Sequence, residues 1–195
     1  MEKMSSIKRA CITAVCIALA CVLPLAFHSL GLGSALSPMH IPVLLCGMVC
    51  GGGYGMFCGI ASPILSCAMS GMPGPSQLIA MAPELAVYGL VTGVLFRRVR
   101  TKNQYADMYL ALLSAMLLGR VAGGIASALL YFGRGEGFTV ALWASSYFVG
   151  TAPGIVSQLI LVPALILALE RAGILPRRYP GTPPAGKTEN KQPVS

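Results

Sequence analysis

Long apolar stretches decide what this chain can fold into, and residues 10–27 and 107–132 are the clearest of them. A helix needs about 20 apolar residues to cross a hydrocarbon core of about 30 Å. Of the 195 residues, 55% are hydrophobic and 10% are charged, whereas soluble domains carry about 25% charged residues. We therefore predict an all-α, polytopic membrane protein.

Turn-forming residues divide these stretches into a bundle of about six helices. The segment "GMPGP" at 71–75 ends one of them, because prolines and glycines in such density cannot continue a helix. The predicted helices cover residues 10–27, 41–50, 54–70, 77–96, 107–132 and 140–169. The first helix begins like a secretory signal peptide, but its apolar run is long enough to span, so we expect it to be retained.

The basic residues predict the topology. With six spans and both termini in the cytoplasm, all but two of the 14 Lys and Arg residues lie inside, as the positive-inside rule requires. The two others are Arg120, within a span, and Arg134, in an external loop. We expect residues 1–175 to form one membrane-embedded domain. Residues 176–195 carry too few apolar groups to order themselves, so we expect a disordered cytoplasmic tail.

The net charge of +8 does not indicate nucleic-acid binding, because the basic residues sit at the ends of apolar runs rather than along one face. The seven cysteines lie inside apolar segments, so we interpret them as small hydrophobic residues rather than as a disulfide framework. Cys46 and Cys50, four residues apart, lack the further ligands of a soft-metal site, and we expect no metal.

Apart from Asp107, the first residue of its span, the charged residues inside the predicted spans are Glu84 and Arg120. Such groups cost about 2.5–3.5 kcal/mol in a bilayer, so they face the protein interior and pair or bind something. We expect Glu84 near the external start of the fourth helix. Counted along their helices from the basic loop at 97–102, both residues lie at about the same depth, some 20 Å from that loop. They can therefore form a structural ion pair, a site for a polar solute, or both.

Further polar and aromatic residues are candidates for the same site. His40 stands where an external loop enters the second helix, so it either binds a ligand or hydrogen-bonds the loop. Tyr88 and Gln158 add an aromatic and an amide group on the fourth and last helices. A pocket of this mixed character suits a small organic solute better than a bare ion.

Small residues recur at four-residue spacing in two places. Ala10, Ala14 and Ala18 form a flat stripe on the first helix, which either packs internally or contacts another protein. Glycines also recur from Gly47 to Gly59 and cluster at 51–53. The cluster lacks the Lys-Ser/Thr of a nucleotide-binding loop, so we predict a tight turn between two short helices.

Four segments carry a family resemblance: "SPMHIPVLLCGMVCGGGYGMFCGIASPILSCAMSGMPG", "MAPELAVYGLVTGVLFRR", "LLGRVAGG" and "TAPGIVSQLILVPALILALE". The chain, over about residues 8–172, resembles the substrate-binding S component of energy-coupling-factor (ECF) transporters, the bacterial vitamin importers. The resemblance implies a six-helix subunit in the bacterial cytoplasmic membrane. It also implies partners: a transmembrane coupling protein and two ATPase subunits that use the ATP, with no cofactor in this chain.

The resemblance also bears on individual residues. Family members present small-residue motifs on the first helix to the coupling protein, and Ala10, Ala14 and Ala18 match that pattern. The "MHIP" at 39–42 is similar to the opening of cobalt and nickel members, but those use a free N-terminal amine, which an internal motif lacks. A metal-ion substrate is therefore disfavoured.

The resemblance does not by itself indicate which substrate is bound. Arg120 could bind a carboxylate through two parallel hydrogen bonds, which favours an acidic vitamin such as pantothenate or niacin. If Glu84 neutralises Arg120, a neutral or cationic solute is as plausible. An intramembrane enzyme is the main competing hypothesis, but the chain has no HExxH motif, no paired aspartates and no nucleophile with a base. A small membrane scaffold or channel is the third.

Overall fold

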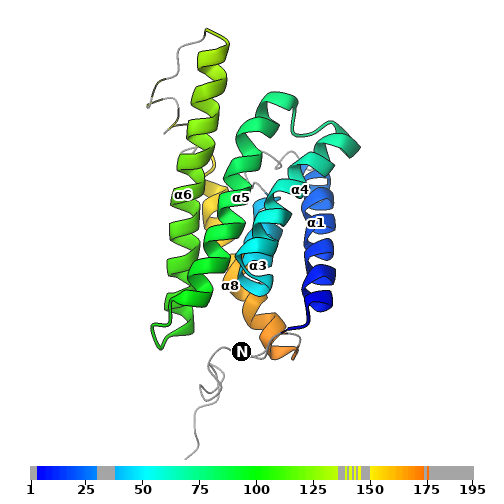
Figure 1. Ribbon diagram of the computed structural model, residues 1–195, viewed down its shortest axis with the longest axis vertical. Helices are drawn as coiled ribbons and strands as arrows, with labels where there is room; N and C mark the ends of the chain where they lie inside the picture. The colour runs from blue at the N-terminus through cyan, green and yellow to red at the C-terminus, as the bar shows by residue number, and fades with distance from the viewer. Residues whose placement is uncertain are drawn as a thin grey trace, which may run out of the picture.

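The computed structural model describes residues 4–29, 38–135, 139, 141, 143, 145, 150–173 and 175. In this part of the chain the regular elements are helices, arranged side by side in a bundle (Figure 1). They are α1 (Ser6–Ser29), α3 (His40–Cys50), α4 (Gly52–Ser70), α5 (Pro75–Arg98), α6 (Gln104–Gly133) and α8 (Ala152–Arg171). All but α3 are long and apolar enough to cross a membrane, which makes this a multi-pass membrane protein.

The short helix α3 lies at the centre of the bundle. It contacts α1, α4, α5 and α8, and most of its side chains are buried. Its 11 residues extend for only about 17 Å at 1.5 Å per residue, which is roughly half of a hydrocarbon core. A helix that is apolar on all sides is stable only when other helices surround it, and this position meets that need.

Glycines shape the junction of α3 and α4 and the packing of α4 on α5. Gly51 separates α3 from α4 with φ +101°, a conformation that other residues rarely adopt, so the predicted tight turn is confirmed. Further on, Gly55 of α4 and Gly89 of α5 face each other. A Cβ on either residue would collide with the backbone of the other, so both helices can approach only because these side chains are absent.

The two ends of the bundle differ in charge. At one end lie the first residues of α1 and α6 and the last residues of α3, α5 and α8 (Figure 1). Here Arg97 donates a 2.6 Å hydrogen bond to the carbonyl of Cys50, at the end of α3. Asp107 accepts hydrogen bonds from the backbone and hydroxyl of Thr101, which fixes the turn between α5 and α6. We call this the basic end; its described Lys and Arg residues are Lys8, Arg9, Arg97, Arg98, Arg100, Lys102 and Arg171.

Two predicted positions were wrong. The last helix was expected over residues 140–169, but a turn at Gly150 and Thr151 precedes α8, which begins at Ala152 with Pro153 in its first turn. Glu84 was expected near the start of its helix, but α5 begins at Pro75, so Glu84 lies in its third turn. The predicted tail, residues 176–195, lies outside the described residues.

Candidate functional site

A cavity of about 860 Å³ opens at the end opposite the basic end. Its wall takes residues from the end of α1, the start of α3, the loop between α4 and α5, the first half of α5 and the second half of α6. This volume lies within the roughly 300–1,000 Å³ of small-molecule sites. The wall mixes apolar side chains with a few polar ones, which is the usual composition of a site for an organic ligand.

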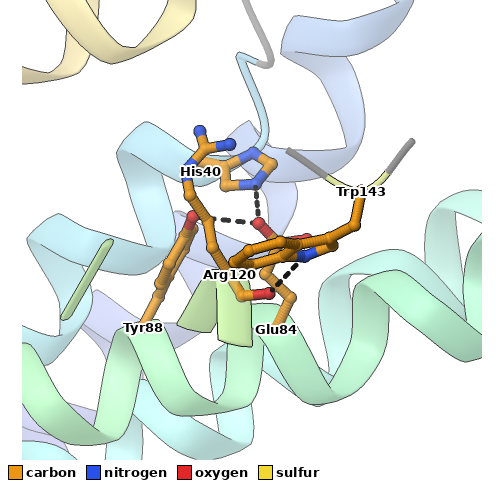
Figure 2. Close-up of polar contacts among 5 residues, drawn as sticks. All are labelled: His40, Glu84, Tyr88, Arg120 and Trp143. Atoms are coloured by element: carbon orange, nitrogen blue, oxygen red, sulfur yellow. Dashed lines mark hydrogen bonds and ion pairs between the residues drawn. The ribbon is translucent and has the colours of Figure 1, made fainter. Parts of the chain in front are cut away.

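Glu84 is the centre of the polar group at the cavity (Figure 2). The Tyr88 hydroxyl, one turn later on α5, donates a 2.9 Å hydrogen bond to Oε1 of Glu84. His40 Nε2, from the start of α3, lies 3.8 Å from the same oxygen. The rings of His40 and Tyr88 are also in contact, with centroids 5.2 Å apart and planes at 56°. The buried carboxylate is thus held by groups from two helices.

Arg120 lines the same cavity from α6 and is 4% exposed. Its backbone carbonyl accepts a 3.3 Å hydrogen bond from Trp143 Nε1 (Figure 2). Gly124, one turn later on α6, leaves room for this indole, because a Cβ there would collide with it. Arg120 is therefore positioned on a rigid helix with an aromatic residue beside its backbone.

Of the alternatives left open for Glu84 and Arg120, the ion pair between the two side chains is not formed. Within the described residues, the ion-pair contact of Glu84 is with His40, and its hydrogen bond comes from Tyr88. The two charges share a cavity, as their similar depth predicted, but equal depth on neighbouring helices does not fix the distance across the space between them. The cavity thus presents the carboxylate of Glu84 and the guanidinium of Arg120 as two separate groups.

The remaining predicted ligand residues divide into two groups. Tyr88 is fully buried and does not line the cavity, but it contacts two residues that do, Glu84 through a hydrogen bond and His40 through its ring. Gln158 of α8 is 1% exposed and does not line the cavity. Its Oε1 atom is buried and has no hydrogen-bond partner among the described residues. Gln158 therefore belongs to the interior of the bundle, away from the cavity.

Three polar cavity residues at the end of α6 were not predicted as part of the site. Ser127 and Tyr131 follow Arg120 on this helix, Arg134 comes directly after its last residue, and all four line the cavity. Their spacings of 7, 11 and 14 residues place them on one face at about 3.6 residues per turn. That periodicity is the signal that could have identified them from the sequence. Arg134, expected in an external loop, adds a second guanidinium at the mouth.

The small-residue stripe of α1 faces away from the bundle. Ala10, Ala14 and Ala18 are all exposed, while Cys16 and Ala20, on the opposite side of α1, are buried against the core. The stripe is thus available to contact another protein, and the suggested role in docking stays a prediction.

The cysteines are free thiols, and five of the seven are buried. The Cys46 Sγ lies 3.5 Å from the hydroxyl of Thr13, which joins α3 to α1. Among the described residues, no three His, Cys, Asp or Glu side chains are grouped so that they could hold a metal ion.

The chain was compared with known proteins. Its residues 8–169 match the family model described as ECF transporter, substrate-specific component. Comparisons with curated proteins and with solved structures give no match. The matched segment includes the cavity residues Glu84 and Arg120, and it covers well over half of the 195 residues. The chain therefore belongs to the ECF transporter family of substrate-specific components.

Proposed function

We propose that this protein is the binding subunit of an ATP-driven importer and that it captures a small acidic solute of vitamin type in the cavity. The observation that carries the acidic preference is the charge of the cavity wall. Its described residues include two guanidinium groups, Arg120 and Arg134, and a single carboxylate, Glu84, which is held by Tyr88 and His40. A wall with this surplus of positive charge attracts an anion.

Arg120 is the residue that we assign to the acid group of the solute. Its guanidinium can donate two parallel hydrogen bonds to one carboxylate, and the buried setting strengthens them. Hydrogen bonds that involve a charged group contribute about 1.5–3 kcal/mol. This corresponds to a tenfold to roughly hundredfold change in affinity, because each 1.4 kcal/mol is about a factor of ten.

The arrangement of Glu84 bears on the choice of solute. A neutral or cationic solute would be equally suitable if Glu84 were the ion-pair partner of Arg120, but the contacts of Glu84 are with His40 and Tyr88. An acid such as pantothenate or nicotinate therefore fits the wall better than a cation. The apolar part of the wall, which includes Leu25, Met39 and Met81, would contact the carbon skeleton of the solute.

The direction of capture follows from charge. The basic end lies in the bacterial cytoplasm by the positive-inside rule, together with both termini, so the cavity faces the exterior. The solute would then pass inward with the help of a transmembrane coupling protein and two ATPase subunits. The exposed stripe Ala10, Ala14 and Ala18 gives that coupling protein a flat surface for close helix contact.

Equilibrium binding to the purified protein in detergent tests the proposed solute class. The panel pairs each acid with a neutral counterpart: pantothenate with pantothenol, and nicotinate with nicotinamide. We expect at least one acid to bind saturably, and its neutral counterpart to bind at least about tenfold more weakly, because the second lacks the charge that Arg120 recognises. Preferential binding of the neutral compounds, or of cationic vitamins, would contradict the acidic solute.

A further inference from the structure

The two oxygens of the Glu84 carboxylate have different surroundings. Both described contacts of this side chain, the hydrogen bond from Tyr88 and the approach of His40, are made to Oε1. For Oε2 the described residues supply no hydrogen-bond donor, although the residue is 7% exposed. Oε2 is not among the described side-chain atoms that are both enclosed and without a partner, and Glu84 lines the cavity, so this oxygen has access to the cavity space.

A carboxyl oxygen at such a place requires a hydrogen-bond donor. A buried polar group without a hydrogen bond costs about 1–3 kcal/mol, and more when it is charged. Native proteins supply partners, including ordered water, to nearly all buried polar groups. The donor for Oε2 therefore comes from the cavity contents, either from water or from the solute.

We propose that the solute supplies this donor, so that it carries a hydroxyl or ammonium group as well as its acid group. This rests on the proposed function, since it concerns the same solute in the same cavity. Arg120 takes the acid group, and Glu84 takes the donor. Because Glu84 and Arg120 are not in ion-pair contact, they are two separate subsites, and a solute must carry the two groups at separate positions to reach both.

Tyr88 and His40 make this subsite selective by holding Oε1. With one oxygen fixed by groups of α5 and α3, the carboxylate cannot turn away when a solute without a donor enters. Such a solute would displace water from Oε2 and leave the oxygen unpaired. A site built around a hydrogen bond rejects analogues that lack the bonding group for this reason. Hydroxy acids and amino acids are accordingly the class expected, and acids without a donor are disfavoured.

Matched acids test this on the unmodified protein. Pantothenate bears hydroxyls at the end opposite its carboxylate, its dideoxy analogue N-(3,3-dimethylbutanoyl)-β-alanine keeps the carboxylate and the amide, and nicotinate is an acid without a hydroxyl or amine. We expect the hydroxylated acid to bind at least about tenfold more tightly than the analogue and nicotinate, because one charge-assisted hydrogen bond is lost in both. Equal or tighter binding of the two acids that lack a hydroxyl or ammonium group would overturn the Glu84 subsite and leave the acidic importer proposal standing. If every acid fails to bind, both fall.

A variant locates the effect at Glu84. In Glu84→Gln the preference for the hydroxylated acid over its dideoxy analogue should shrink to within about threefold, while the affinity for the analogue should not fall, since Arg120 is untouched and one negative charge is removed from the wall. Glu170→Gln is the matched control: it removes a carboxylate at the basic end, where Glu170 accepts a hydrogen bond from Gln104, and should leave the preference intact. A loss of affinity for both acids in equal proportion would show that Glu84 only supports the fold. If Glu84→Gln does not fold, the comparison of matched acids on the unmodified protein decides alone.

Discussion

Tyr88 donates a 2.9 Å hydrogen bond to Oε1 of Glu84, and the two side chains lie one turn apart on the same face of α5. Both are buried, so the bond is formed away from water, where it contributes most. It joins a cavity residue to a residue of the core. Loss of this bond should therefore affect both the site and the fold.

Tyr88→Phe should destabilise the protein, because Glu84 loses the donor of its only described hydrogen bond while remaining buried. The expected cost is about 1–3 kcal/mol, which thermal unfolding in detergent would register as a lower Tm. Tyr109→Phe is the control, since Tyr109 is exposed on α6. Equal Tm values for the two variants would contradict this role of Tyr88.

Substitutions of Arg120 should weaken binding of the acidic solute in two steps. Arg120→Lys keeps the charge but loses the planar fork, and we expect about a tenfold loss; Arg120→Gln loses both, with an expected loss of about a hundredfold. Calorimetry on the purified variants would measure these affinities. Arg98→Gln, at the exposed basic end, should bind as the unmodified protein does. If the solute binds Arg120→Gln with unchanged affinity, a residue other than Arg120 binds its acid group.

Arg134 should affect the association rate of the solute more than its affinity. It is exposed at the mouth of the cavity, where its charge draws an anion inward without being desolvated. Arg134→Gln should lower the association rate several-fold at low salt, and the difference should shrink as salt screens the charge. Stopped-flow measurements over a salt series would show this. A purely faster dissociation would instead make Arg134 a direct ligand.

Gly89→Ala should be strongly destabilising, because the new methyl group would meet the backbone of Gly55 and force α4 away from α5. Overpacking of this kind costs about 1–3 kcal/mol. Gly53→Ala is the matched control: its methyl group would enter open space, and alanine stabilises a helix by up to about 1 kcal/mol over glycine. The two Tm values should therefore move in opposite directions.

The α1 stripe should serve association and not capture. Ala14→Leu with Ala18→Leu adds bulk to a surface that faces away from the bundle, so co-purification with a coupling protein should fail while solute binding persists. Ala164→Leu with Ala168→Leu places the same bulk on an exposed face of α8 and should leave the complex intact. Retained association in the α1 variant would remove the stripe from the interface.

Helix positions could be predicted where the chain gives strong stop signals. Gly51 and the segment 71–75 ended helices where expected, because glycine and proline leave few conformations open there. The last helix was misplaced for the opposite reason. Gly150 and Pro153 are common inside membrane helices, so they did not reveal the turn that precedes α8.

The depth of the site residues along their helices could be predicted from the sequence, but their contacts could not. Counting residues from the basic loop brought Glu84 and Arg120 to one cavity, since rise along a helix is nearly constant. Which residue faces which depends on helix rotation and on α3, whose start inserts His40 next to Glu84. The same holds for Gln158: the sequence indicated that it is buried in a helix bundle, but not that its side chain points away from the cavity.

The short central helix gives the bundle an open half and a filled half. Below the cavity floor, Leu44, Met48 and Leu112 are almost completely buried, and this packed layer continues for about 20 Å from Glu84 to Arg97 along α5. The cavity is thus closed at its inner end and does not continue through the bundle. Side chains from several helices form this floor, so the rotation of a single side chain would not remove it. A path from the cavity to the basic end would therefore need a movement of whole helices.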